Sequence, residues 1–325
     1  MSLRPLPLAL ALSLTCAALL VLGASVGAHG LDAALWAAPS LVTELRLPRS
    51  LAAWGCGALL GLAGAIAQGL FRNPLADPYL LGASAGASLG VALALVLAGN
   101  SAGALLAGSG WGLNLAAFAG AWGALGLTVL LSRGVSHTPR LLLAGVIVGV
   151  VLAAATQGLT LLDPSTLRPM QQFMLGSTSL LGWPQVALSL PLLALALTAA
   201  LVGSRTLDAL GLGEATARSL GLPLDGTRAL LLALLALCSG AAVAQCGLVA
   251  FVGLVAPHTV RALGVSRYRW LLPLSALSGG ALLLAADIVA RWVMAPIELP
   301  VGLPTALLGG AYLLSRLAHS TGAAR

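Results

Sequence analysis

The chain has 325 residues, of which 59% are apolar and 8% charged, and its mean hydropathy is +1.02. A soluble domain carries about 25% charged residues because its surface faces water, so this composition excludes a soluble protein. All sixteen basic residues are arginine. Without lysine there is no G-x-x-x-x-G-K-[ST] loop to hold a nucleotide, and we expect neither an internal motor nor an enzyme. The net charge of +7 does not indicate nucleic acid, because the arginines are scattered along hydrophobic segments.

The first apolar run, from Leu6 to Val26, follows Arg4 and is long enough to cross a bilayer. Small residues at 24–28 allow a cleaved signal peptide as the alternative, but the length favours a first transmembrane helix. Nine further apolar segments follow: 49–70, 79–98, 112–132, 140–161, 184–203, 227–245, 247–257, 271–290 and 302–318. The segment 247–257 is too short to cross unaided, so we expect it to be tilted or continuous with its flanks. The sequence predicts one all-α polytopic membrane domain over 1–325, with about ten transmembrane helices.

The distribution of arginine predicts the orientation of these helices. An even number of spans places both termini on one side. With both termini in the cytoplasm, twelve arginines lie inside and only four, Arg46, Arg49, Arg168 and Arg291, lie outside. Positive charge gathers on the cytoplasmic side of membrane proteins, so we expect this orientation. Glycines four residues apart, such as Gly57 and Gly61, predict helices that pack closely.

The stretch between the second and third segments reads Gln68-Gly-Leu-Phe-Arg-Asn-Pro-Leu-Ala-Asp-Pro-Tyr-Leu-Leu-Gly82. Asn73-Pro74 and Asp77-Pro78 predict turns, because each proline fixes its own φ and biases the preceding residue away from helix. Taken by itself, the stretch is a turn that leads the chain back into the membrane.

Together with Arg46-Leu-Pro-Arg49 before it and Gly86-Ala87 after it, this stretch resembles the permease family of vitamin B12, ferric-siderophore and haem importers. Three later segments extend the resemblance over nearly the whole chain: Leu212–Leu222, Gly247–His258, and Ala286–Arg291 with Glu298–Gly302. The resemblance implies the type II ABC importer permease fold, formed by a homodimer with the translocation path along its axis. It also implies a location in the bacterial inner membrane, two separate ATP-binding cassette ATPase subunits and a periplasmic substrate-binding protein.

The resemblance further implies that the loop at about 205–224 holds the coupling helix, which docks on the ATPase. Gly213 can begin this short helix, and Glu214 falls in its first turn, where the helix dipole favours negative charge. Leu210, Leu212, Ala217 and Leu220 form the expected apolar face, and Arg218 is free to pair. The candidate coupling residues are Leu212, Gly213, Glu214, Ala217, Arg218 and Gly221, the last one position later than the glycine of similar loops. A solvated amphipathic linker is the alternative.

On the outer face, the resemblance assigns Arg46, Arg49 and Arg291 to docking of the binding protein. Charge pairs across such a contact set register and speed encounter. The alternative is arginine that reaches lipid headgroups near helix ends. Asp287 lies inside a predicted span, four residues before Arg291, and this spacing favours an ion pair that orients Arg291 over a proton relay.

The translocation path is expected along the segment 140–161 and the stretch after it, as in the family. Its candidate residues are Thr156, Gln157, Arg168, Met170 and Met174. We expect a short re-entrant helix over 163–174, in which Arg168 meets a cargo carboxylate such as a haem propionate. The two methionines share one helical face, and packing is their expected role.

Haem is the preferred cargo, with ferric siderophore or cobalamin as alternatives. We expect no permanently bound cofactor and no metal site. The four cysteines lie in apolar stretches without C-x-x-C spacing. A secondary transporter driven by an ion gradient is the alternative from another class, and it would need ion ligands at the membrane midplane.

Overall fold

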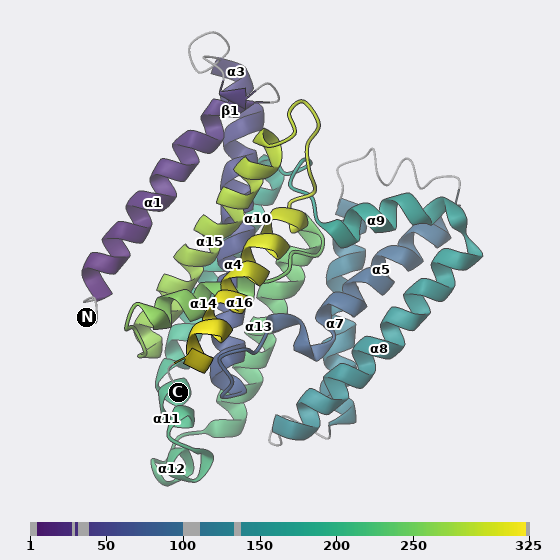
Figure 1. The fold of residues 1–325 in the computed structure, drawn as a ribbon. Coiled ribbons are helices and arrows are strands. Elements are labelled where there is room, and N and C mark those ends of the chain that lie inside the picture. The colour runs from purple at the N-terminus through teal and green to yellow at the C-terminus, as the bar shows by residue number, and fades with distance from the viewer. Residues whose placement is uncertain (1–4, 28–29, 32–38, 100–110, 133–137, 323–325) are drawn as a thin grey trace.

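The computed structural model describes residues 5–27, 30–31, 39–99, 111–132 and 138–322. Over these residues the chain is a bundle of helices, with one antiparallel pair of two-residue strands, β1 (Val26–Gly27) and β2 (Gly30–Leu31). Figure 1 shows two groups of helices: a main group around α4 (Leu47–Leu70), and a second group formed by α5 (Ala83–Ala98), α7 (Trp111–Leu131), α8 (Thr138–Leu162) and α9 (Leu167–Leu175).

Ten apolar helices correspond in order to the ten predicted spans. Besides α4, α5, α7 and α8, they are α1 (Pro5–Ser25), α10 (Trp183–Val202), α13 (Leu224–Cys246), α14 (Val252–Ala262), α15 (Tyr268–Trp292) and α16 (Gly302–Gly322). Among the described residues, seven helices are long and apolar enough to cross a membrane alone, whereas α5, α14 and the stretch Gly302–Ser315 of α16 are shorter. The predicted all-α fold of about ten transmembrane helices is confirmed.

Two predicted spans differ most from the structure at their starts. The second span is longer at its start, because α3 (Pro39–Leu41) and a π-helical turn over Val42–Arg46 run directly into α4. The eighth span starts later: Gly247 and Phe251 have left-handed backbones, with φ of 69° and 68°. These residues break the helix, so α14 begins at Val252 instead of residue 247.

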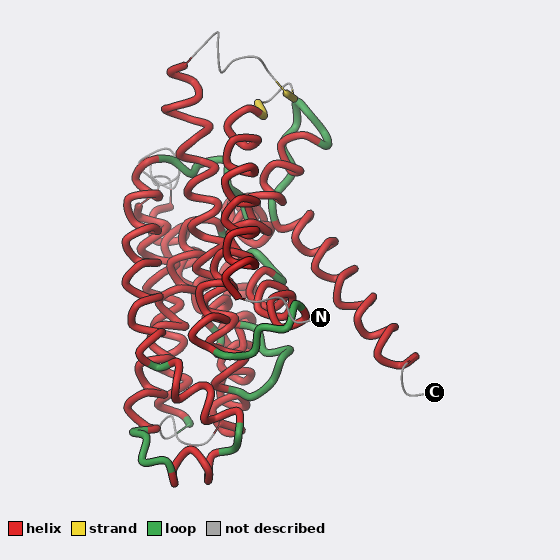
Figure 2. Tube along the Cα trace, turned by 90° about the vertical axis from the view of Figure 1, so that its left-hand side faces the viewer, coloured by secondary structure: helices red, strands yellow, loops and turns green. Residues whose placement is uncertain are grey.

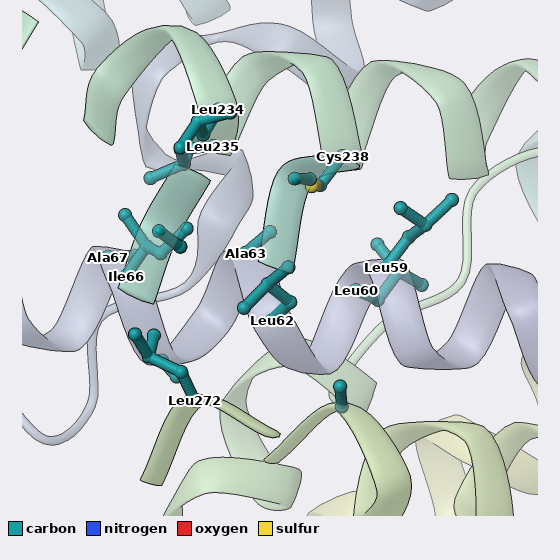
Figure 3. Packing of buried hydrophobic residues seen from close by; sticks show 14 of the residues in the cluster. Leu59, Leu60, Leu62, Ala63, Ile66, Ala67, Leu234, Leu235, Cys238 and Leu272 are labelled. Atoms are coloured by element: carbon teal, nitrogen blue, oxygen red, sulfur yellow. The ribbon is translucent and has the colours of Figure 1, made fainter. Parts of the chain in front are cut away.

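The centre of the main group is α4, which is the most deeply buried of the seven spans. Gly57 and Gly61 face α15 so closely that a Cβ on either would meet a backbone carbonyl oxygen, that of Gly279 or Ser275. The predicted close packing at this glycine pair is therefore confirmed. Leucines of α4 belong to one core with side chains of α13 and α15, and Figure 3 labels Leu60, Leu235 and Leu272 among its members.

The second group packs by the same principle. A Cβ on Gly86 or Gly90 of α5 would meet the backbone of α7, at Gly120 and Ala116. Between the two groups, Asn73 and Asp77 form the predicted turns, with side chains that accept from the backbone nitrogens of Leu75 at 2.9 Å and Tyr79 at 2.8 Å.

The two ends of the bundle are distinct. In Figures 1 and 2, α1 begins and α16 ends in the half that carries α11 (Ser204–Gly211) and α12 (Glu214–Ser219). We call this the α12 end, and the opposite end, with α3 and β1, the α3 end. Termini in the same half agree with an even number of spans. Which end faces the cytoplasm stays a prediction from the arginine distribution.

Candidate functional site

The predicted coupling segment forms two short helices at the α12 end. Gly213, with φ of 109°, precedes α12, and Gly221, with φ of 71°, follows it. Glycine adopts such left-handed backbones without steric cost, which explains why both positions are glycine. The helix begins at Glu214, as the sequence predicts.

Glu214 is the centre of an ion-pair cluster on this segment. Its Oε1 lies 2.8 Å from Nη2 of Arg218, and its Oε2 lies 3.1 Å from Nη2 of Arg228, which is buried on α13. The pKa of Glu214 lies below its usual value, first because Arg228 donates a hydrogen bond and also through the charges of both arginines. Arg218 therefore forms its ion pair within α12, and the ion pair of Glu214 with Arg228 connects this helix to α13.

The apolar face expected on this segment is only half exposed. Leu210 and Ala217 have no exposed surface and belong to the main core, so this part of the apolar face packs inside the chain. Leu212 and Leu220 are 71% and 61% exposed. Two buried residues thus anchor the segment, while two leucines are presented at the α12 end.

At the α3 end, the buried carboxylate of Asp287 on α15 organises a polar network. Oδ1 of Asp287 accepts hydrogen bonds from Nε and Nη2 of Arg49, at 3.2 and 3.1 Å, and from Oγ1 of Thr178, at 2.6 Å. Oδ2 forms an ion pair with Nη2 of Arg291 at 2.7 Å, as the i,i+4 spacing predicts. Nη1 of Arg49 also donates to Glu298 at 2.9 Å. Two arginines are balanced here by two carboxylates.

The three candidate docking arginines differ in exposure. The side chain of Arg291 is 3% exposed and donates to the carbonyl oxygens of Gly23 and Val26, at 2.9 and 3.2 Å. Its donors are therefore used inside the bundle, at the α3 end. Arg49 is 13% exposed, and Arg46 is half-buried beside Gly27. Docking by these arginines stays a prediction.

The candidate path residues do not gather into one site. On α8, Thr156 is buried and donates to the carbonyl oxygen of Leu152 at 2.9 Å, whereas Gln157 is exposed. The hydroxyl of Thr156 therefore donates within its own helix. The translocation role of Thr156 and Gln157 stays a prediction.

The predicted re-entrant helix is α9, which follows a 3₁₀ turn over Pro164–Thr166. Arg168 is exposed on it. Met170 is 3% exposed and packs in a core cluster with α5 and α7, as expected. Met174 is 48% exposed, so the expectation that it packs is wrong for the single chain. The two methionines therefore do not share one environment.

Sequence reasoning did not find two members of the network around Asp287. Glu298 lies in a segment that carried the family resemblance, so its position was a usable signal. Thr178 lies in the loop before α10, and nothing in its neighbourhood predicted a hydrogen bond to a carboxylate 109 residues away.

The four cysteine side chains lie inside the bundle. Cys16, Cys56, Cys238 and Cys246 are free and buried, in agreement with a packing role. Over the described part of the chain, no group of three or more histidine, cysteine or acidic side chains is placed to hold a metal ion.

Residues 9–318 of the chain match the FecCD transport family. The chain belongs to this family. The resemblance inferred from the motifs around Arg49, Asp77 and Glu214 is thus confirmed.

Two curated relatives are similar to the chain over most of their length. The Fe(3+)-citrate import system permease protein YfmD of Bacillus subtilis (strain 168) is 38% identical over 275 residues, covering 84% of this chain and 80% of the relative. The vitamin B12 import system permease protein BtuC of Escherichia coli O157:H7 is 40% identical over 307 residues, covering 92% and 91%. Both are named as permeases of import systems.

Solved structures agree with the FecCD assignment. A structure described as an inward-facing conformation of a metal-chelate type ABC transporter matches with a TM-score of 0.85 and 27% identity, over 97% of this chain and 99% of that one. PsaBC from Streptococcus pneumoniae in complex with Fab matches with a TM-score of 0.59 and 17% identity, over 82% and 88%, which shows a likeness of fold alone. The type II importer permease fold implied by the sequence is therefore confirmed.

Proposed function

We propose that this FecCD chain is the non-catalytic, membrane-spanning subunit of a binding-protein-dependent ABC importer in the bacterial inner membrane. It moves an iron chelate, with haem as the first candidate, and ATP is hydrolysed in a separate subunit. One observation carries the proposal: Leu212 and Leu220, which flank α12, are exposed at the α12 end, while Ala217 anchors the helix to the core. A short helix that is flanked by two exposed leucines is suited to bind in a groove of a partner protein.

The connections of this segment would pass motion from a partner to the bundle. Leu207 and Leu210 of α11 are fully buried in the main core. Oδ1 of Asp208 accepts a hydrogen bond from the backbone nitrogen of Tyr268, at the start of α15, at 3.0 Å. Because buried contacts and this hydrogen bond join α11 to α15, a displacement of α12 would also displace α15.

A homodimer with the path between its subunits is supported by two exposed apolar faces. Val146, Ile147, Val150 and Val151 of α8 are between 51% and 65% exposed, and Leu307 and Leu314 of α16 are 74% and 68% exposed. In Figure 2, α16 leans away from the rest of the bundle. These faces would cover each other across the dimer axis, with Thr156, Gln157 and Met174 near the path.

The haem assignment is supported by the position of Arg168. It is exposed on α9, directly after the apolar α8, and a guanidinium there would bind a carboxylate of the cargo in two-point fashion. Ferric siderophore or cobalamin is the second candidate. The names of the two curated relatives, which refer to Fe(3+)-citrate and vitamin B12, support that second candidate.

Co-isolation tests the importer assignment. We expect the native chain to purify with an ATP-binding cassette subunit, and Leu212→Ser with Leu220→Ser to abolish that association. Leu180→Ser is the matched control, because Leu180 is 81% exposed in the loop before α10, at the opposite end from α12. Uptake driven by an ion gradient in vesicles that contain this chain alone would contradict the assignment.

Reconstitution tests the cargo. Proteoliposomes with the chain, its ATPase and its binding protein are supplied with haem, a ferric siderophore or cobalamin. We expect ATP-dependent uptake of haem, reduced in Arg168→Gln. Uptake of siderophore or cobalamin but not haem would contradict the haem assignment and leave the importer assignment intact.

A further inference from the structure

A cavity of about 460 Å³ opens at the α12 end, and the proposed function assigns no role to it. Its walls come from three places: the end of α4 with the following turn, α11, and the junction of α14 with α15. Its charged lining consists of Arg72, Arg261, Arg267 and Asp208. We call it the basic cavity.

The arginines of the basic cavity have no acidic partner within the described residues. The ion pairs found there involve other arginines, at positions 49, 218, 228 and 291. Asp208 already accepts the hydrogen bond from the backbone nitrogen of Tyr268. Three cations against one carboxylate leave an excess of two positive charges, and a pocket with such an excess attracts anions.

The position of Arg261 is fixed before any ligand binds. Its Nη2 donates to Oη of Tyr268 at 2.8 Å, its Nε donates to Oε1 of Gln68 at 3.4 Å, and its guanidinium lies 5.2 Å from the centre of the Tyr268 ring. Gln68 is 2% exposed and held by the carbonyl oxygen of Leu254, at 3.2 Å. These contacts leave Nη1 of Arg261 free to donate to an anion, at little further cost in side-chain entropy.

Arg72 reaches the cavity from an unusual backbone. Its φ is 50°, in the left-handed region that residues other than glycine seldom adopt. Arg72 and Arg267 are both exposed, on different walls of the cavity. Together with Arg261, they give an incoming anion three guanidinium groups from three segments of the chain.

We propose that the basic cavity receives an acidic side chain of the ATPase subunit, as a second contact beside α12. This inference rests on the proposed function. The argument for this occupant is continuity: Leu212, which is 71% exposed and presented with α12, also lines the cavity. A partner that covers Leu212 therefore reaches the mouth of the cavity. A carboxylate matches the arginines in charge and accepts their hydrogen bonds in pairs.

Such a contact would connect three segments of the chain to one residue of the partner. The cavity joins the end of α4, α11 and the start of α15. A carboxylate bound there bridges α4 to α15 directly, whereas α12 is connected to them through α11 and α13. An anionic lipid headgroup would satisfy the same charges, and the experiment separates it from the ATPase.

Charge reversal tests the proposal on the intact chain in nanodiscs, with the purified ATP-binding cassette subunit identified by co-isolation. We expect Arg72→Glu and Arg267→Glu each to weaken binding of that subunit by about tenfold at low ionic strength, and less at high ionic strength. Arg269→Glu is the matched control. Arg269 lies 5.9 Å from the Trp270 ring and does not line the cavity, so we expect a change within about twofold.

A photo-crosslinking residue in place of the exposed Ser266, which also lines the cavity, gives a second readout that does not depend on charge reversal. We expect an adduct with a segment of the ATPase that contains Asp or Glu. An adduct with lipid, or none with the ATPase, overturns the proposal. Unchanged affinity in both arginine variants, while Leu212→Ser abolishes binding, also overturns it and leaves the proposed function standing. If the native chain binds no ATPase, the proposed function itself fails.

Discussion

Arg49 on α4 binds Asp287 on α15 through two nitrogen atoms, which lie 3.2 and 3.1 Å from the same carboxylate oxygen. The side chain of Asp287 has no exposed surface, and its other oxygen pairs with Arg291, which is 3% exposed. A buried charge is tolerated only when it is paired and hydrogen-bonded. The carboxylate of Asp287 therefore stabilises the largely buried charges of Arg49 and Arg291 at the α3 end.

Asp287→Asn should therefore destabilise the chain strongly. The substitution leaves two largely buried guanidinium groups with one carboxylate, Glu298, which is 34% exposed. Loss of one member of a buried ion pair costs about 3–5 kcal/mol, and thermal unfolding of the chain in nanodiscs measures it. Asp225→Asn is the control, because Asp225 is exposed in the first turn of α13. Equal melting temperatures for the two variants would contradict the role of Asp287.

The arginines at the α3 end should separate into two classes. Arg291→Gln should lower the melting temperature, because it removes an ion pair and donors to Gly23 and Val26. Arg46→Gln should slow association with the binding protein, since charges at the edge of a contact act on the rate of encounter. Surface binding kinetics and thermal unfolding give both quantities. A stable Arg291→Gln variant with slowed association would reverse this division.

The sequence predicted the helices because it carries strong local signals for them. Long apolar runs, the absence of charge and the pairs of glycines four residues apart each act within a single helix. Asp287 and Arg291 were predicted to pair for the same reason, as they lie one turn apart on α15. The turn at Asn73 and Asp77 was also local, fixed by the two prolines that follow.

Contacts between distant segments were not predictable in this way. Thr178 and Glu298 meet Arg49 across 129 and 249 residues. No pattern near Thr178 marks it, and the motif around Glu298 does not indicate which arginine it meets. The burial of Ala217 depends on how α12 packs on the core, so the apolar face looked continuous in sequence although only Leu212 and Leu220 are exposed. The predicted topology placed Arg291 on the outer face, yet its contacts with Asp287, Gly23 and Val26 hold its side chain inside the bundle.

The ion pairs of Glu214 predict a pH dependence of the coupling segment. Arg228 and Arg218 lower the pKa of Glu214 from its ordinary value of 4.5. The ionised form is therefore favoured by folding, and its stabilisation is present above pH 4.5 and is lost as pH falls through the lowered pKa. Glu214→Gln should cost about 1 kcal/mol at neutral pH, and the difference from the native chain should vanish in acid. Thermal unfolding as a function of pH checks this, and a difference that grows in acid would contradict it.

Two glycines of the bundle should respond in opposite ways to the same substitution. On Gly61 of α4, a Cβ would meet the carbonyl oxygen of Ser275 and lie 3.1 Å from Cα of Gly279, so Gly61→Ala must push α15 away. Such overpacking costs about 1–3 kcal/mol. On Gly123 of α7, a Cβ would have no atom within 4 Å, so Gly123→Ala should gain about 0.5–1 kcal/mol from the reduced freedom of the unfolded backbone. Thermal unfolding of both variants gives the signs directly. A stabilised Gly61→Ala variant would mean that α4 and α15 are not in backbone contact at this position.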